Sequence, residues 1–403
     1  MKNNTAPRIM ITAPAIAALL ALAACTSDSE RQEPNYKPAP QTVESQAPEA
    51  DDQDLRLPYQ LEELPLLDPG WASPPQQAGG IYLAPGETNG TLTFTAIDTD
   101  GTILWQAERP LSCAGFTLTN DGTQDLAVLT DLEPDEDSFG ATTATAYNLE
   151  TGEQVWGPVE VPGPHQGPGL VFAAPPEEHF GDLGPKVVLD PATGEALYDE
   201  DADSNTNVIG EYHGTVLVAE DEQIHAYSSP AQDLEWSLSL SDNGWPRDQV
   251  YGADSTNSGF LTGALIGVEA DNQTLVDLTT GEIIANDLRD AAQDPTTGTW
   301  IALGEDLAGY DETGEQIFTN PDAEDLQTIE GIGGVMVYLR TSDGRIQVHN
   351  VVSGDVAQAY DPEGQGIIAT PTYISEVGAA VVKYTDGYLF TPITETTDEP
   401  GAE

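Results

Sequence analysis

Residues 96–105 read AIDTDGTILW, and a pattern of this kind occurs seven times along the chain. Each copy has a short apolar run that ends near Asp or Asn, then a tight turn, then a second short run with an aromatic residue. The copies are AIDTDGTILW (96–105), AYNLETGEQVW (146–156), VVLDPATGEALY (187–198), AYSSPAQDLEW (226–236), LVDLTTGEIIA (275–285), GYDETGEQIF (309–318) and VHNVVSGDVAQAY (348–360). This periodicity predicts a repeat architecture built from one kind of hairpin.

The turn is the most regular part of the repeat. A hairpin loop of this kind needs positive φ at its last residue, which glycine adopts without strain, and an Asp or Asn before it bonds back to the turn amides. The expected turn glycines are Gly101, Gly152, Gly194, Gly281, Gly314 and Gly354. The copy at 226–236 has Gln232 where the other copies have glycine.

An aromatic residue follows the turn in most copies, where its wide ring is expected to pack between neighbouring sheets. These residues are Trp105, Trp156, Tyr198, Trp236 and Phe318. Two copies depart from the pattern, because Ala285 replaces the aromatic residue and Tyr360 arrives two residues late. The repeat is therefore degenerate but periodic.

Two further β-like runs precede each hairpin, so each unit is expected to be a four-stranded antiparallel meander. Such units, about 40 residues long, are typical of β-propeller blades. Three more strand-like runs follow the seventh copy, at 366–375, 379–384 and 387–393. Residues 55–61 alternate between apolar and polar and are expected to add the fourth strand, which closes the ring. The sequence predicts an all-β, single propeller over residues 55–396 with eight blades, or with seven if residues 164–199 form no complete sheet.

The charge of the chain excludes one class of partner. Its 403 residues include 69 Asp and Glu against 12 Lys and Arg, for a formal net charge of −57. Nucleic acids repel a chain of this charge, because proteins bind nucleic acids through basic side chains. The 39% hydrophobic residues are enough for a core, so the acidity belongs to the surface of a folded protein. It indicates either adaptation to salt or a means of staying soluble.

The first 25 residues have the pattern of an export signal. Lys2 and Arg8 precede an apolar run that ends in Leu22-Ala23-Ala24-Cys25. This ending resembles the lipobox of bacterial lipoproteins, which implies that residues 1–24 are removed and that Cys25 carries acyl chains such as palmitate. Several acyl chains give stable anchoring. We therefore expect a protein that is exported and held at the outer face of the cell membrane.

Two segments are predicted to lack a fixed structure. Residues 25–54 carry the lipidated cysteine and then a polar, Pro-containing tether with few apolar residues. Residues 397–403 form an acidic tail. Neither composition can bury enough apolar surface to offset the entropy of ordering.

The repeat resembles the pyrroloquinoline-quinone-like (PQQ-like) propeller repeat. Members of that family include cofactor-dependent alcohol and glucose dehydrogenases and also cofactor-free lipoproteins that act as scaffolds. The lipobox, the polar tether and the acidic propeller together look like those of bacterial, in particular actinobacterial, lipoproteins. The resemblance implies the fold and leaves the function open among these classes.

A quinone cofactor is not expected. Dehydrogenases of this family have adjacent cysteines beside the cofactor, whereas Cys113 stands alone and is interpreted as a small buried residue. The quinone trianion also needs Arg and Lys around it, and twelve such residues in the whole chain make a basic pocket improbable. No enzymatic activity is therefore expected, with a degenerate quinoprotein as the least favoured interpretation.

Two groups of residues are candidate metal sites. Asp199, Asp201, Asp203 and Asn205 offer oxygen ligands at alternate positions, as a calcium loop does, but the turn glycine and the bidentate Glu of an EF-hand are missing. The favoured interpretation is a solvated acidic loop. His165 and His179 flank an irregular stretch and are interpreted as loop residues rather than metal ligands.

The favoured function is a lipid-anchored, non-enzymatic, monomeric scaffold that binds an envelope protein of unknown identity. The alternative is a propeller that binds a small ligand or cation, such as a sugar or calcium, in its channel. Function in propellers resides in loops and channel. Three insertions are the first candidates, at 131–141, 162–183 and 240–259. Trp245 and Tyr251 in the last insertion are interpreted as buried at a blade edge rather than as exposed anchors.

Overall fold

The structure is a computed structural model that describes residues 36–50, 54–133, 141–175, 184–229, 232–253, 262–269, 272–321, 323–385 and 387–393. All of these residues belong to one unit, Tyr36–Glu403. The predicted signal peptide, Cys25, His179 and the predicted acidic tail lie outside the described residues. Within the described ranges the fold is all-β, and its one helical element is the 3-10 turn η1 (Ser241–Asn243). The expected fold class is confirmed at this level.

Antiparallel meanders, which we number 1 to 8, follow one another along the chain, and a short parallel pairing between the first strands of meanders 7 and 8 joins these two in one sheet. Meander 1 contains β4 (Gln76–Ala78), β5 (Ile81–Thr88), β6 (Thr91–Ile97) and β7 (Thr102–Pro110). Meander 2 contains β8 (Phe116–Asn120), β9 (Asp125–Glu133), β10 (Ala141–Asn148) and β11 (Gln154–Val161). Meander 3 contains β12 (Val171–Ala173), β13 (Lys186–Leu189) and β14 (Ala196–Asp199). Meander 4 contains β15 (Asn207–Tyr212), β16 (Thr215–Glu220), β17 (Gln223–Ser228) and β18 (Asp233–Ser239).

The second half of the chain continues the series. Meander 5 contains β19 (Tyr251–Ala253), β20 (Gly263–Glu269), β21 (Asn272–Asp277) and β22 (Ile283–Leu288). Meander 6 contains β23 (Asp290–Gln293), β24 (Trp300–Leu303), β25 (Leu307–Tyr310) and β26 (Gln316–Asn320). Meander 7 contains β27 (Leu326–Gly333), β28 (Met336–Thr341) and β29 (Ile346–Asn350). Meander 8 contains β31 (Thr370–Ile374), β32 (Ala380–Tyr384), β33 (Gly387–Thr391) and, from the N-terminal side, β3 (Leu67–Trp71).

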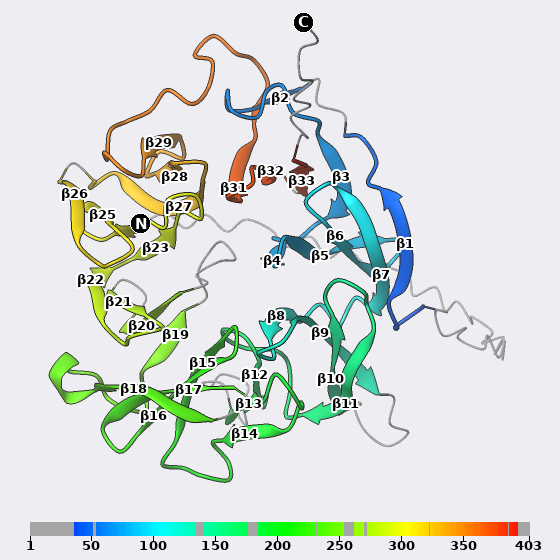
Figure 1. The fold of residues 1–403 in the computed structure, drawn as a ribbon, viewed down its shortest axis with the longest axis vertical. Coiled ribbons are helices and arrows are strands. Elements are labelled where there is room, and N and C mark those ends of the chain that lie inside the picture. Colours follow the sequence, from blue (N-terminus) through cyan, green and yellow to red (C-terminus); the bar gives the residue numbers. More distant parts are fainter. Residues whose placement is uncertain are drawn as a thin grey trace, which may run out of the picture. The chain divides into compact units, whose positions relative to one another are not determined.

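The hydrophobic core is divided into clusters, each of which joins two meanders. Trp105 and Leu129 lie in a cluster between meanders 1 and 2, and Trp236 lies in a cluster between meanders 4 and 5. Tyr82 and Phe390 lie in a cluster between meanders 1 and 8, with ring centroids 4.9 Å apart. Figure 1 shows that the first strand of each meander lies on the inner side, toward a common centre. Meanders packed face to face in this way are the units of a β-propeller.

The hairpin turns form as expected. All six expected turn glycines have positive φ, from 70° to 81°. Gln232, which replaces glycine in its copy, has a φ of 54° and so takes up the same left-handed region. The Asp or Asn before the turn accepts bonds from the turn amides, as Asp277 Oδ1 does from Thr279 N and Thr280 N. The local chemistry of the turn was therefore predicted correctly.

The repeat aromatic residues pack between meanders, as expected. The indole N–H of Trp105 donates to the carbonyl of Leu149 in the next meander at 2.8 Å. Trp236 donates in the same way to Leu278 O at 2.7 Å. All three repeat tryptophans are buried, whereas Tyr198 and Phe318 are half-buried. A ring at this position thus ties one meander to the turn of the next.

The expected strand at 55–61 is wrong. Only β2 (Leu55–Arg56) is extended there, and it pairs in parallel with β30 (Ile367–Ile368) rather than with meander 8. Leu57 and Leu61 are buried against meanders 7 and 8, but Leu57 lies in an irregular segment after β2 and Leu61 lies in a turn. The strand that pairs with β33 is β3, through Leu67 opposite Phe390 and Trp71 opposite Tyr388.

The predicted tether at 25–54 is also partly wrong. β1 (Gln41–Gln46) pairs with the outer strand of meander 1, β7, as a fifth strand. Lys37 O accepts a bond from Glu108 N at 2.8 Å, and the Arg109 guanidinium donates to Pro38 O. Backbone bonds to a strand edge, together with the packing of Val43 and Ala47 on the cluster between meanders 1 and 8, order this segment. The strand edge is supplied by a distant part of the chain, which is why composition did not predict it.

Candidate functional site

Meander 7 differs from the others at its outer edge. Every other copy of the repeat hairpin leads into an outer strand, and these strands are β7, β11, β14, β18, β22 and β26. After Gly354, the chain makes one isolated bridge, between Val356 and His349, with bonds from Asn350 N to Asp355 O at 2.9 Å and from Ala357 N to Val348 O at 2.8 Å. It then leaves the sheet toward β30. β29 is therefore the edge strand of its sheet.

Tyr360, the late aromatic residue of this copy, turns toward meander 8. Its hydroxyl donates to Ala369 O at 3.1 Å, and its ring lies 6.4 Å from that of Tyr338 at an interplanar angle of 78°. Burial raises the pKa of the Tyr360 hydroxyl, so the group stays neutral and acts as a donor. The shift of two residues thus moves the aromatic residue away from its place in the repeat.

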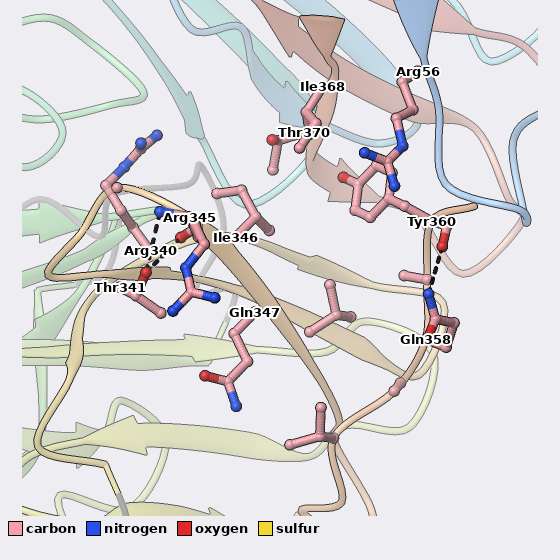
Figure 2. Close-up of a pocket in the computed structure, with 15 residues that line it drawn as sticks. Arg56, Arg340, Thr341, Arg345, Ile346, Gln347, Gln358, Tyr360, Ile368 and Thr370 are labelled. Carbon is pink, nitrogen blue, oxygen red and sulfur yellow. Dashed lines mark hydrogen bonds between the residues drawn. The ribbon is translucent and has the colours of Figure 1, made fainter. Parts of the chain in front are cut away.

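A cavity of about 840 Å³ opens where the chain leaves β29. We call it the arginine groove, because Arg56, Arg340 and Arg345 line it together with Ile346, Val348 and Tyr360. Figure 2 shows Arg340 and Arg345 on one side of the groove and Arg56 beside Tyr360 on the other. Three of the chain's eight arginines are gathered here, and no described residue that lines the groove is Asp or Glu.

Two of these arginines have carboxylate partners. Arg340 Nε lies 2.5 Å from Glu330 Oε1, and Lys383 Nζ lies 3.7 Å from the other oxygen of Glu330. The hydrogen bond from Arg340 lowers the pKa of Glu330, so this carboxylate is held ionised between two cations. Arg345 pairs with Asp343 at 2.7 Å, and its side chain is 80% exposed, so the pair is weak in water.

Arg56 is held differently. Its guanidinium lies 5.8 Å from the centroid of the Tyr360 ring and donates to the carbonyl of Asp361. Its buried Nε has no hydrogen-bond partner among the described residues. No carboxylate of the described residues forms an ion pair with it. Arg56 is thus the cation of the groove whose charge is not balanced by a direct partner.

The sequence did not predict this groove, because twelve Lys and Arg in the whole chain gave no reason to expect three arginines in one place. Arg56 comes to Arg340 and Arg345 only through the pairing of β2 with β30. Two signals were present in the sequence. Arg340 and Arg345 are close neighbours in a chain with few arginines, and Tyr360 is displaced from its expected place.

A second cavity, of about 980 Å³, lies among meanders 1, 2, 6 and 8. Gln77, Asp125, Asp294 and Glu376 are among its lining residues, and Gln77 donates to the Tyr373 hydroxyl at 3.1 Å. Its charge is opposite to that of the arginine groove. Such a cavity suits a polar ligand or a cation.

Glu211 is an unexpected buried carboxyl group. It lies on β15 and accepts bonds from the Thr119 hydroxyl at 2.7 Å, Gly214 N at 2.6 Å and Leu170 N at 3.1 Å. These donors come from meander 2, from meander 4 and from the segment before β12. Burial raises the pKa of Glu211 to about 7, although the three hydrogen bonds act in the opposite direction. Nothing in the sequence distinguished this Glu from the many others.

The calcium candidate is not assembled as a site. Asp199 Oδ1 accepts from Asp201 N and Asp203 Oδ1 accepts from Asn205 N, so these oxygens serve their own turns. The Arg247 guanidinium donates to the side-chain oxygen of Asn205. Among the described residues, no group of three or more His, Cys, Asp or Glu side chains is placed to hold a metal ion.

The other residues singled out in the sequence take part in packing or in local hydrogen bonds. Cys113 is buried, and burial raises the pKa of its thiol. His165 Nε2 lies 2.6 Å from Gly169 O, and its ring contacts Phe172. Trp245 packs against the cluster between meanders 4 and 5 and Tyr251 lies on β19, but both are only half-buried, so the expected burial is found in part. The 131–141, 162–183 and 240–259 insertions each include residues outside the described ranges.

No family model and no curated protein matches this chain. Among solved structures, BamB from Moraxella catarrhalis is 16% identical with a TM-score of 0.38, over 87% of this chain and 99% of that chain. The computationally designed Ika8 protein is 11% identical with a TM-score of 0.40, over 85% and 99%. A chain of the Mitotic Checkpoint Complex is 12% identical with a TM-score of 0.40, over 90% and 98%. These likenesses are distant, so the fold assignment rests on the registers and clusters described above.

The fold and the groove together define a β-propeller in which, among the described residues, meander 7 lacks the outer strand that follows the repeat hairpin elsewhere. In the described part of the chain, no helix has the length and apolar character needed to cross a membrane.

Proposed function

We propose that this chain is a lipid-anchored, non-enzymatic scaffold that holds another envelope protein at the outer face of a bacterial membrane. The observation that supports an interaction role best is that meander 7 lacks an outer strand, so that Ile346 at the start of β29 has no described strand beside it. Proteins usually cover such edges, because an exposed strand edge pairs with other chains. Val356 and Ile368, which line the groove beside this edge, are 63% and 41% exposed. An exposed apolar surface next to a free edge favours a protein partner.

The proposal includes a closed ring of eight blades. Its support is the pairing of β3 with β33, and the cluster in which Tyr82 of meander 1 packs against Phe390 of meander 8. Meander 3, in the divergent region, has three strands and an additional bridge between His165 and Phe172. It has no fourth strand among the described residues, but it packs against meander 2 and meander 4 as the other meanders pack against their neighbours, and on this ground we count it as a blade and propose eight. A ring closed by a strand from the N-terminal side is a rigid base for a partner.

Anchoring is the part of the proposal that rests on sequence alone. Cys25 ends the apolar run at the position expected for lipidation. We expect Cys25→Ala to release the protein from membranes into the soluble fraction. A variant that still sediments with lipid, while wild-type signal processing is intact, would contradict the anchor.

In-cell crosslinking tests the scaffold itself. We expect one dominant protein partner, crosslinked through residues of meanders 7 and 8, when the membrane-anchored chain is isolated and analysed by mass spectrometry. The released Cys25→Ala variant is the matched control, and its yield of this partner should fall. A chain that yields no enriched partner would contradict the scaffold.

The alternative is a propeller that binds a small polar ligand or a cation. The cavity of about 980 Å³ with Asp125, Asp294 and Glu376 in its lining supports this alternative. A ligand-dependent rise in melting temperature that Asp294→Asn removes would favour it over the scaffold.

A further inference from the structure

The bonding pattern of β29 leaves one part of its edge open. Val348 O accepts a bond from Ala357 N, so the backbone polar groups of Val348 point away from β28. These groups alternate in direction along an antiparallel strand, so those of Ile346 also point outward. No described strand pairs with Ile346 on that side. The free edge therefore begins where the chain after Ala357 leaves the sheet.

The arginine groove lies beside this free edge. Ile346 and Val348 give it an apolar wall, and exposed Val356 and Ile368 border it. An extended peptide fits a site of this form, because its backbone bonds to the edge and its alternate side chains enter the neighbouring pocket. The site is thus shaped for an additional strand.

The charges of the groove specify the kind of strand. Arg56, Arg340 and Arg345 are gathered in a chain whose formal net charge is −57. Guanidinium groups bind carboxylates through two parallel hydrogen bonds. Most of this protein repels an acidic segment, whereas the groove offers Arg56 without a carboxylate partner and Arg345 in an exposed, weak pair.

The protein itself contains a strand bound in this way. β1 pairs with the outer edge of meander 1, and the Arg109 guanidinium donates to a backbone carbonyl of the incoming segment at Pro38. An outer edge with an arginine beside it therefore accepts an added strand in this fold. Meander 7 has the edge and the arginines without a described strand on it.

From these observations we propose that the arginine groove binds an extended, acidic segment of a partner protein, which adds a strand to β29 at Ile346. The proposal rests on the scaffold function and names the chemistry of its partner. It also names the two recognition elements. The backbone edge of β29 gives affinity, and the arginines select carboxylate side chains.

Binding of a designed peptide to the purified full chain tests this proposal. The probe is a fluorescent ten-residue peptide of alternating Glu and Val, and its counterpart has Thr in place of Glu. We expect the acidic peptide to bind at least tenfold more tightly than the Thr peptide. Arg56→Gln and Arg345→Gln should each weaken the acidic peptide about tenfold, which is about 1.4 kcal/mol. Arg247→Gln, outside the groove, should leave binding unchanged.

Two N-methylated forms of the acidic peptide test strand addition. Methylation of every Glu amide blocks one edge of the peptide, and methylation of every Val amide blocks the other edge. Pairing with β29 predicts that one form loses binding and that the other keeps it. Equal binding of both forms would overturn strand addition.

Three other results would overturn the proposal. They are equal binding of the acidic and Thr peptides, no effect of the groove substitutions, and binding only after residues 394–403 are removed. The last result would assign the groove to the chain's own acidic end. A partner crosslinked in cells at another surface would leave the scaffold intact and contradict only the groove.

Discussion

The indole ring of Trp156 lies on Gly194, the turn glycine of the next meander. Its Nε1 donates to Pro191 O in the same turn at 2.7 Å. A Cβ at Gly194 would be 2.5 Å from Trp156 Cε3, and Gly194 has a φ of +72°. This glycine is therefore needed for two reasons, since the turn requires left-handed backbone and the ring leaves no space for a side chain.

Gly194→Ala separates these two reasons when it is compared with Gly314→Ala. Gly314 has a φ of +78°, but the nearest atom to its Cβ would be 4.0 Å away. We expect Gly314→Ala to cost about 1–2 kcal/mol for the backbone alone. Gly194→Ala should cost about 1–3 kcal/mol more, because the ring must move. Thermal and urea unfolding measure both, and equal losses would contradict a role of the ring contact.

The repeat was readable from the sequence because its parts are local. Turn glycines, the Asp or Asn before them and the aromatic residue after them lie within about ten residues, so their chemistry does not depend on the rest of the fold. Even Gln232, which breaks the pattern, adopts the left-handed conformation that the turn demands. The surrounding hairpin thus decides this residue's conformation more strongly than its own preference.

The closing strand could not be predicted from the sequence, because it depends on packing with distant parts of the chain. Residues 55–61 have the alternation of a strand, yet Leu57 and Leu61 reach buried positions from outside any strand. Leu67–Trp71 contains Asp, Pro and Gly, which disfavour strands. It pairs with β33 because Leu67 and Trp71 fill the cluster between meanders 1 and 8. Tertiary packing overrides local preference at this position.

The arginine groove could not be predicted from the sequence for a third reason. It requires Arg56 to meet Arg340 and Arg345, which lie at the other end of the chain. It also requires the absence of an outer strand on meander 7, which follows from the path of the chain after Ala357. No motif or spacing encodes such a meeting of distant segments.

Glu211 predicts a pH dependence of stability. Its pKa is raised from 4.5 to about 7 in the folded protein, so the native state keeps a proton that the unfolded state has lost. Stability from this group is therefore present below about pH 4.5 and decreases as the pH rises through 7, by on the order of 3 kcal/mol. We expect the stability difference between wild type and Glu211→Gln to shrink from pH 5 to pH 8.

Other carboxyl groups also titrate, so the comparison between variants is essential. Glu235→Gln, at an exposed position on β18, is the control and should leave the pH profile unchanged. Melting temperatures measured at half-unit pH steps give the difference curve. A difference between wild type and Glu211→Gln that is flat over this range would show that Glu211 does not titrate there.

Calcium should have no specific effect on stability. The oxygens of Asp199 and Asp203 bond to their own turn amides, and Arg247 places a positive charge against Asn205. We expect millimolar calcium to change the melting temperature no more than the same concentration of magnesium. A calcium-specific rise that Asp201→Asn removes would instead assign the loop as a cation site.

Salt should stabilise the protein, because most of its carboxylates have no positive charge to pair with. The chain has 69 acidic and 12 basic residues, and only five ion pairs form among the described residues. The screening length falls from about 30 Å at 0.01 M salt to about 8 Å at 0.15 M. Repulsion between carboxylates in the folded state should fall with it. We therefore expect the melting temperature to rise as NaCl is added over this range.

Choline chloride at the same ionic strength separates screening from binding of sodium. Screening depends on ionic strength alone, so both salts should raise the melting temperature by similar amounts. A rise with NaCl only would indicate that sodium binds to the carboxylates of the folded chain. A melting temperature that stays level or falls with both salts would mean that self-repulsion does not limit stability, despite the excess of negative charge.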